Sequence, residues 1–413
     1  MNKPDQLTRP QIFTALACTG LGSFVAALIA WAILDRTNLP AFNTSMVTRG
    51  LATAVSVGLL VLVAVLLWQW RTADHHPRWR GALTYLVSYL SPAGLTIATL
   101  GIPLSATRLW LDGLQVDQLF RTQFLTRTAT NFGYQDMNYL DMPTYYPLGW
   151  FWGGGRLANL LDMPGWEVYQ PWALVSLATA AALLVPVWQA LTGSLPLATT
   201  LALANTAVTL SMAADEPYAA IVGMGIAPAV VMAARAVRGS WLAVAGVAVY
   251  LGVSATMYTL FVGVTALIAI VLTIHYFWTA ERSIGPFLRL VVMGLGSMAI
   301  AAISWGPYLY LVATADYKPS SVAQHFLPSE GTQVPLPFFE FSALGFFSLL
   351  GLLYLVLRST RRPLLIATVV LYGWVLASML MTLLGSTLLG FRIELPIALI
   401  LSTAGFFALA DTD

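Results

Sequence analysis

The chain has 413 residues, of which 58% are hydrophobic and only 9% are charged. Soluble domains carry about a quarter charged residues, so this composition excludes an ordinary soluble protein and indicates a polytopic membrane protein. The formal net charge of +2 gives no support to nucleic-acid binding, and a single cysteine, Cys18, excludes a disulfide or a cysteine metal site within the chain.

Long apolar runs follow one another from the N-terminus onward. A helix needs about 20 residues to cross the hydrocarbon core, and the first run is too long for the apolar region of a signal peptide. The predicted fold class is therefore an all-α polytopic membrane protein with about 11–13 transmembrane helices. The candidate spans lie at 13–34, 50–69, 83–105, 171–191, 196–214, 218–235, 241–257, 259–277, 288–312, 339–357, 363–385 and 394–410.

The basic residues predict the orientation of these spans. Arginines gather in the loop 69–82, at 235–238, at Arg282 and at 358–362. Cytoplasmic loops carry the excess of Lys and Arg, so we expect a multi-pass plasma-membrane protein with a cytoplasmic N-terminus. The long loop 106–170 then lies on the extracytoplasmic side. Counted over all the segments on that side, 13 of the 18 acidic residues are extracytoplasmic.

The loop 106–170 holds most of the polar residues that chemistry would need. The stretch "VDQLFRTQFLTR" predicts a helix in which Asp117 and Arg121 share a face, either at a reaction site or as a structural ion pair. Asp136 and Asp141 follow among aromatic residues, as catalytic groups, solvated carboxylates or helix N-caps.

An extracytoplasmic enzyme has few nucleotides at hand, so a lipid-activated sugar is the expected donor. Transfer needs a carboxylate base, for which Asp117 is the first candidate, with Asp136 and Asp141 as alternatives. It also needs cations to hold the lipid phosphate and aromatic faces for sugars. The phosphate candidates are Arg121, Arg127, His325 and Arg392, and the sugar candidates include Tyr145, Tyr146, Trp150 and Trp152.

Each of these candidates has an ordinary alternative. The Tyr and Trp residues also suit the interfacial aromatic belt, His325 an ordinary surface, and Arg392 a snorkelling side chain at a span end. In "AADEPY", we interpret Asp215 and Glu216 as a hydrophilic turn, with the alternative that they face the same cavity as Asp117.

Motifs of other enzyme classes are missing from the sequence. It contains neither a GxxxxGK[ST] phosphate loop nor an HExxH pair, and His75 and His76 are expected on the opposite side of the membrane from His325. The sequence therefore argues against an ATP-driven pump and against a zinc hydrolase. A transporter or flippase of a lipid-linked sugar stays as the alternative function, although few charges fall inside the spans.

Three stretches carry a family resemblance. "VDQLFRTQFLTR", "QDMNYLDMPTYYPLGWFWGGGR" and "HFLP" resemble the membrane domain of the actinobacterial galactan arabinofuranosyltransferases, most specifically over residues 108 to 160. The resemblance implies a GT-C type fold, a decaprenyl-phosphate-arabinose donor, galactan as acceptor, a membrane-lipid environment and no nucleic acid. It names no certain cofactor and leaves a divalent cation open.

The resemblance also assigns residues and domains. Asp117 takes the place of the loop acid, and Gln123 becomes a candidate sugar contact. The matching polar positions are Arg121, Gln123, Arg127, Asp136, Asp141 and Arg156. Many GT-C enzymes have paired acids where this chain has Asp117-Gln118. Residues 1–413 are expected to form one transmembrane glycosyltransferase domain, without the extracytoplasmic C-terminal domain of the family.

Overall fold

The protein is built from α-helices. The computed structural model describes residues 5–41, 46–72, 77–115, 117–138, 144–280, 282–314, 333–358 and 362–411. Over these ranges the chain forms helices and connecting loops and no β-strand, which confirms the predicted all-α class.

Within the described ranges, ten helical segments are long and apolar enough to span a membrane. They are Arg9–Asp35, Met46–Thr72, Arg78–Leu104, Tyr169–Thr192, Leu195–Ala213, Pro217–Val237, Thr259–Thr279, Gly285–Thr314, Arg362–Thr382 and Gly390–Ala410. The other two predicted spans are helical but have only 15 residues each, α11 (Trp241–Ala255) and α14 (Ala343–Leu357). The second starts later than predicted because the Ser342 side chain accepts a hydrogen bond from the Gly345 N–H and caps the helix there.

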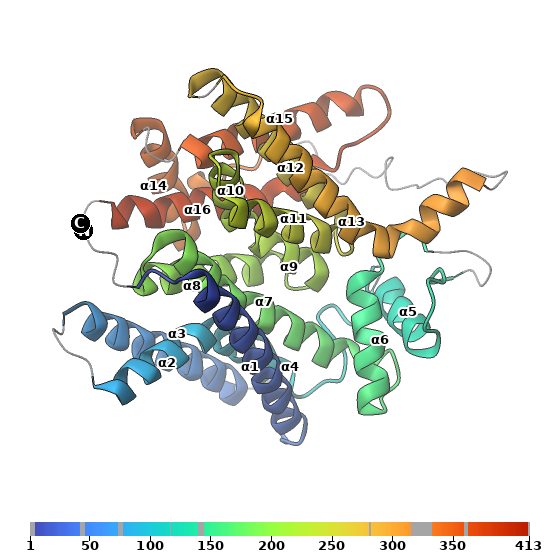
Figure 1. Cartoon of the computed structure of the whole chain (residues 1–413). Helices are drawn as coiled ribbons and strands as arrows, with labels where there is room; N and C mark the ends of the chain where they lie inside the picture. The colour runs from blue at the N-terminus through green and yellow to red at the C-terminus, as the bar shows by residue number, and fades with distance from the viewer. Residues whose placement is uncertain are drawn as a thin grey trace. The chain divides into compact units, whose positions relative to one another are not determined.

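The chain divides into two compact units, residues 1–131 with 151–224 and residues 132–150 with 225–413. Figure 1 labels the helices of both units. The first unit, called unit 1, contains α1 (Arg9–Asp35), α2 (Met46–Thr72), α3 (Arg78–Thr96), α4 (Ile102–Leu104), α5 (Asp117–Thr130), most of α6 (Gly149–Leu161), α7 (Tyr169–Thr192), α8 (Leu195–Ala213) and α9 (Pro217–Met224).

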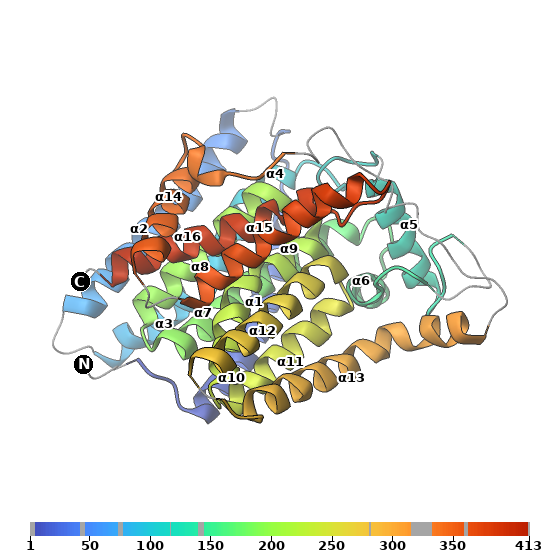
Figure 2. The same ribbon diagram turned by 90° about the horizontal axis from the view of Figure 1, so that it is seen from above.

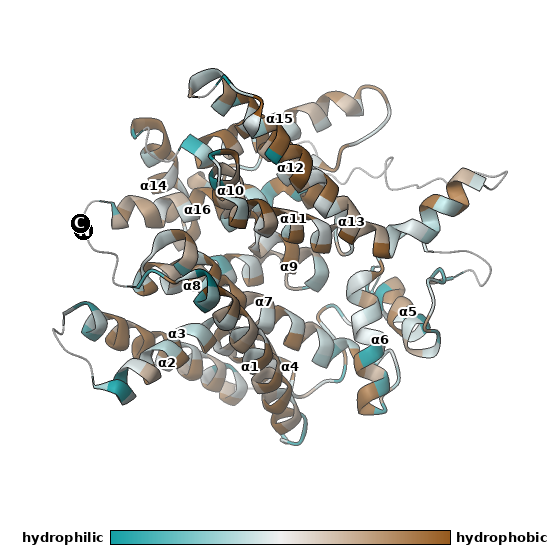
Figure 3. Cartoon of the chain, viewed as in Figure 1, coloured by the Kyte–Doolittle hydropathy of each residue, from teal (hydrophilic) through white to brown (hydrophobic). Residues whose placement is uncertain are grey.

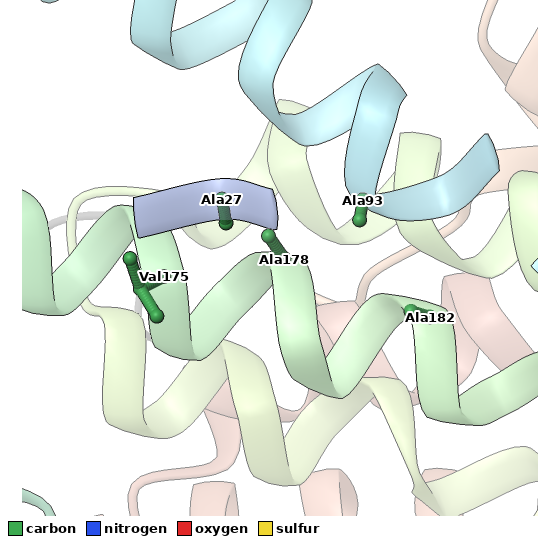
Figure 4. Packing of buried hydrophobic residues seen from close by; sticks show 5 residues of the cluster. All are labelled: Ala27, Ala93, Val175, Ala178 and Ala182. Carbon is green, nitrogen blue, oxygen red and sulfur yellow. The ribbon is translucent and has the colours of Figure 1, made fainter. Parts of the chain in front are cut away.

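Small side chains hold the centre of unit 1 together. Ala27 of α1, Ala93 of α3 and three residues of α7 form one buried cluster, shown in Figure 4. The α7 members are Val175, Ala178 and Ala182. Lipid tails are as apolar as leucine, so helices in a membrane associate through close packing, which small residues permit.

The N-terminal segment is bound to the helices of unit 1 through Asp5. Its carboxylate is buried and accepts hydrogen bonds from the Trp70 indole N–H at 3.2 Å and from the Leu195 backbone N–H at 3.0 Å. The second bond satisfies a backbone donor at the start of α8, where a negative charge is favoured by the helix dipole. Asp5 is therefore held by contacts with residues up to 190 positions away.

The second unit, called unit 2, contains the remaining helices and the loop 132–150. Its helices are α10 (Ile226–Val237), α11, α12 (Thr259–Thr279), α13 (Gly285–Thr314), α14, α15 (Arg362–Thr382) and α16 (Glu394–Ala410). Figure 2 shows α13 running alongside α11, in agreement with their extensive contacts. Helices α14 and α16 approach each other closely, since a Cβ added to Gly351 would lie only 1.9 Å from the Leu401 carbonyl oxygen.

Hydropathy sets α5 apart from the spanning helices. Figure 3 shows long hydrophobic stretches along α1 and α13, whereas α5 mixes hydrophilic and hydrophobic residues. This helix lies in the part of the chain where the sequence concentrates its polar residues, and it is the framework of the candidate site.

Candidate active site

Helix α5 has charges that suit both of its ends. Asp117 lies in its first turn and Arg127 in its last turn. Acidic residues are stabilising at a helix N-terminus and basic residues at a C-terminus, because the aligned peptide dipoles leave partial charges there. The predicted helix over this stretch is confirmed.

Glycines of the "GWFWGGGR" stretch allow α6 to approach α5 closely. A Cβ added to Gly155 would lie 2.5 Å from the carbonyl carbon of Thr128. The Thr128 hydroxyl donates to the Phe151 carbonyl at 2.8 Å, and the Arg156 guanidinium donates to the Thr128 carbonyl. The rings of Phe124 and Phe151 stack with centroids 4.5 Å apart. These contacts hold α5 against α6 within unit 1.

Arg121 is the centre of a buried polar group on the same buried face of α5, nearer to its N-terminus. Its side chain is 3% exposed, and its Nη2 lies 3.1 Å from Oε1 of Glu216, which is also buried. Its Nε donates to the Tyr218 hydroxyl at 3.1 Å and its Nη1 to the Asp215 carbonyl at 3.3 Å. Asp117, one turn earlier, forms the predicted ion pair with Arg121 at 3.8 Å.

The turn between α8 and α9, residues 214–216, is held at further points. Gln118 donates through Nε2 to the Asp215 carbonyl at 2.9 Å, and Tyr169 donates to Oε1 of Gln118 at 2.5 Å. The Trp110 indole donates to the Ala214 carbonyl at 3.0 Å. We call Gln118, Arg121, Tyr169, Glu216 and Tyr218 the Arg121 cluster. It ties α5, α7 and the α8–α9 turn together.

The electrostatics of the cluster favour a charged arginine. Burial by itself lowers the pKa of the Arg121 guanidinium, but the negative surroundings supplied by Tyr218 and Glu216 outweigh it, so the pKa lies above its ordinary value. Burial and the adjacent Glu216 carboxylate raise the pKa of the Asp215 carboxyl above its ordinary value, and Arg121 opposes this in part. Asp215 is half-buried, and its carboxylate has no hydrogen-bond or ion-pair partner on another described residue.

The remaining predicted residues differ in exposure. Asp117 is 52% exposed, and Gln123, Tyr145 and Trp152 are also exposed. The half-buried ones are Arg127, Tyr146 and Arg392. The Arg156 guanidinium lies over the Trp152 ring at 5.6 Å. Asp141 and His325 lie outside the described residues.

Three predicted roles disagree with the burial of the side chains. Asp136 is fully buried, and its Oδ1 accepts a hydrogen bond from the Asn138 N–H at 2.9 Å, which argues against contact with an acceptor. Trp150 is 1% exposed, so its ring offers no face to a sugar. Arg121 is also buried, among partners that saturate its nitrogens, which argues against direct contact with a donor phosphate.

The interpretation of Asp215 and Glu216 as a plain hydrophilic turn is also wrong. These residues do form a turn, but Glu216 is buried and ion-paired with Arg121. The sequence reading missed Gln118, Tyr169 and Tyr218 as members of the cluster. The available signal was the adjacent pair of acids at a span end, where uncompensated charge is costly and a basic partner is required.

The predicted residues are divided between the two units. Unit 1 contains Asp117, Arg121, Gln123, Arg127 and Trp152, and brings the first two together with Asp215 and Glu216. The members in unit 2 are Asp136, Tyr145, Tyr146, Trp150 and Arg392. Across the ranges that the structure describes, no three His, Cys, Asp or Glu side chains gather in a group able to hold a metal ion.

Comparison with known proteins gives one family and several relatives. A family model described as "Arabinofuranosyltransferase N terminal" matches residues 15–413. The galactan 5-O-arabinofuranosyltransferase of Corynebacterium glutamicum is 51% identical over 425 residues, covering 99% of this chain and 64% of the relative. The proteins of the same name from Mycolicibacterium smegmatis and Mycobacterium tuberculosis strain H37Rv are 38% and 36% identical, each over 96% of this chain and over 65% and 62% of their own lengths.

Proposed function

Because the chain belongs to the family described as Arabinofuranosyltransferase N terminal, we propose that it acts in the transfer of arabinofuranose to a hydroxyl group of galactan. The observation that carries this proposal is the name shared by relatives with 36% to 51% identity over nearly the whole chain. The chain spans 62% to 65% of the length of these relatives. The polar residues on and around α5, among ten apolar candidate spans in the described ranges, support the proposal.

The proposed donor is decaprenyl-phosphate arabinose, used on the extracytoplasmic face of the plasma membrane. A lipid-linked donor suits a protein with ten candidate spans, because the lipid tail can stay in the membrane while the sugar reaches the site. The extracytoplasmic face follows from the arginines that gather in loops on the opposite side of the predicted topology.

The proposed reaction is a single displacement with inversion. The oxygen of a galactan hydroxyl forms a bond to the anomeric carbon of arabinofuranose as the bond from that carbon to the phosphate oxygen breaks. A carboxylate takes the proton of the attacking hydroxyl, and the electron pair of the broken bond leaves with the polyprenyl phosphate. The negative charge that develops on this phosphate needs cationic neighbours.

Asp117 is the proposed base. Its carboxylate is half-exposed and so can be reached by an acceptor, and its ion pair with Arg121 at 3.8 Å holds it next to the Arg121 cluster. Asp141 stays a proposed alternative base, and Arg127, His325 and Arg392 stay the proposed phosphate ligands. Gln123, Tyr145, Tyr146 and Trp152 are proposed contacts for the sugars of donor and acceptor.

The test is transfer of radiolabelled arabinose from synthetic prenyl-phospho-arabinose to a galactan oligosaccharide by the purified protein in lipid. Asp117→Asn keeps the shape of the side chain and removes its charge, so it should lower kcat about a hundredfold with little change in donor KM. Arg108→Gln, at an exposed ion pair on the same unit, is the matched control and should keep normal turnover.

Two outcomes would redirect the proposal. An absence of arabinose transfer by the unaltered protein would remove the proposed activity. Normal turnover of Asp117→Asn together with loss in Asp141→Asn would move the base along the same loop. Transport of a lipid-linked sugar is less well supported, because the charged residues of the ten candidate spans lie near the span ends.

A further inference from the structure

All three nitrogens of the Arg121 guanidinium are directed at protein groups. Its three nitrogens contact the Tyr218 hydroxyl, the Asp215 carbonyl and the Glu216 carboxylate at 3.1 to 3.3 Å. Its guanidinium carbon also lies 5.5 Å from the centroids of the Phe120 and Tyr218 rings. The N–H groups of a guanidinium lie in a fixed fork, so turning the fork towards a phosphate would require these contacts to be broken.

The charge of Arg121 is also balanced before any ligand arrives. Its strongest partner, Glu216, is also buried and lies 3.1 Å away. A site that stabilises a leaving phosphate needs positive charge that is still available to the phosphate. The pair of Arg121 and Glu216 has no net charge and therefore gives little to that task.

The contacts instead fix the backbone of the α8–α9 turn against α5. The Asp215 carbonyl accepts from both Gln118 and Arg121, and the Tyr218 hydroxyl donates to Glu216 at 2.9 Å. Glu216 is thereby turned inward. The carboxylate of the adjacent Asp215 is half-buried and makes none of the cluster's hydrogen bonds.

We propose that Arg121 is a positioning residue that, together with Glu216, fixes the turn carrying Asp215 against the helix carrying Asp117, so that these two residues supply the working carboxylates, and that Arg121 is not a ligand of the donor phosphate. This inference rests on the proposed transfer reaction. It adds Asp215 to the reaction from a segment nearly a hundred residues away from Asp117, and it assigns the phosphate to other cations such as Arg127.

The charges around Asp215 allow the inference to be tested through the pH dependence of the reaction. The groups that act on its carboxyl are Glu216 beside it, Arg121 on α5 and Asp112 in the preceding loop, and it in turn affects Tyr169. Removing the positive charge of Arg121 should raise the pKa of Asp215 further, whereas removing the negative charge of Glu216 should lower it. A purely structural role would not move a pH profile in opposite directions.

The experiment measures kcat, donor KM and the acid limb of the kcat/KM profile with prenyl-phospho-arabinose and a galactan oligosaccharide. Arg121→Gln should move the acid limb to higher pH and Glu216→Gln to lower pH, each by about half a unit or more. Arg121→Lys, which keeps the charge but not the fork, should lower kcat about tenfold with donor KM within about twofold. Tyr218→Phe, which keeps every charge, should lower kcat without moving the limb.

Arg127→Lys provides the contrast, because a phosphate ligand should change donor KM and leave the acid limb in place. An Arg121→Lys variant with normal kcat and a donor KM raised about tenfold would make Arg121 a phosphate ligand and overturn the inference. If the charge-removing variants do not fold, Arg121→Lys and Tyr218→Phe still distinguish a positioning residue from a phosphate ligand.

Amide hydrogen exchange separates this inference from the proposed function. Arg121→Lys should speed exchange in α5 and in residues 214–218 relative to the unaltered protein, whether or not arabinose is transferred. If the unaltered protein showed no transferase activity, the proposed function and the catalytic purpose of the positioning would both be overturned. Faster exchange in Arg121→Lys would still show that Arg121 holds α5 and the α8–α9 turn together. Normal transfer and unchanged exchange in Arg121→Lys would overturn the inference alone.

Discussion

Removing the Glu216 carboxylate should destabilise the protein far more than removing an ion-pair partner at the surface. Glu216→Ala leaves the guanidinium of Arg121, 3% exposed, with Asp117 as its nearest carboxylate at 3.8 Å, and Asp117 is half in solvent. Breaking a buried ion pair in this way costs about 3–5 kcal/mol of unfolding free energy, because an uncompensated charge stays buried.

A matched control exists in the same unit. Arg108 and Glu167 lie 3.2 Å apart, nearly the same separation as in the buried pair, but Arg108 is 70% exposed. Solvent screens such a pair, so Arg108→Ala should cost less than about 1 kcal/mol. The two ion pairs differ in burial and hardly in distance, so the difference in unfolding free energy between the two variants measures the effect of burial.

The assay is equilibrium unfolding in mixed micelles, followed by tryptophan fluorescence, with the unaltered protein, Glu216→Ala, Arg108→Ala and the double variant Arg121→Met/Glu216→Leu. The double variant should recover most of the loss, since it removes both charges and leaves neither unpaired. Equal unfolding free energies for Glu216→Ala and Arg108→Ala would refute the reasoning, and so would a double variant less stable than Glu216→Ala.

Other properties of the chain lead to further expectations. Gly155→Ala should cost about 1–3 kcal/mol, because its Cβ would lie 2.5 Å from the Thr128 backbone, while Gly22→Ala in α1, with open space around it, should be neutral or stabilising in the same unfolding assay. Asp215→Asn should stabilise the fold at neutral pH: the pKa of Asp215 is raised in the folded state, so its contribution is fully present below the ordinary value of 3.8 and is lost as pH rises through the raised value. That gain should vanish in unfolding curves measured below about pH 4, and a gain of equal size there would contradict the assignment. In a Cys18→Ser background, a cysteine at Asn138 should react with an impermeant thiol reagent in intact cells and one at Ala73, which lies outside the described residues, should not; the reverse pattern would overturn the proposed face.

The sequence by itself determined the class of the protein and the local part of the site. Span length and apolar content are properties of continuous segments, so all twelve predicted segments are helical in the structure, and ten have the length to cross a membrane. The ion pair of Asp117 with Arg121 was predictable for the same reason, because residues four apart share a face of any helix.

Only the tertiary structure decided which polar residues meet and which are buried. Arg121 and Tyr218 are 97 positions apart, and no local pattern states that α5 lies against the α8–α9 turn. Asp136 and Trp150 resemble exposed loop residues in sequence, yet neighbouring segments cover them. Burial and long-range pairing depend on which helices lie side by side. The arrangement of helices is therefore what converted Arg121 from a predicted phosphate ligand into the centre of a buried cluster.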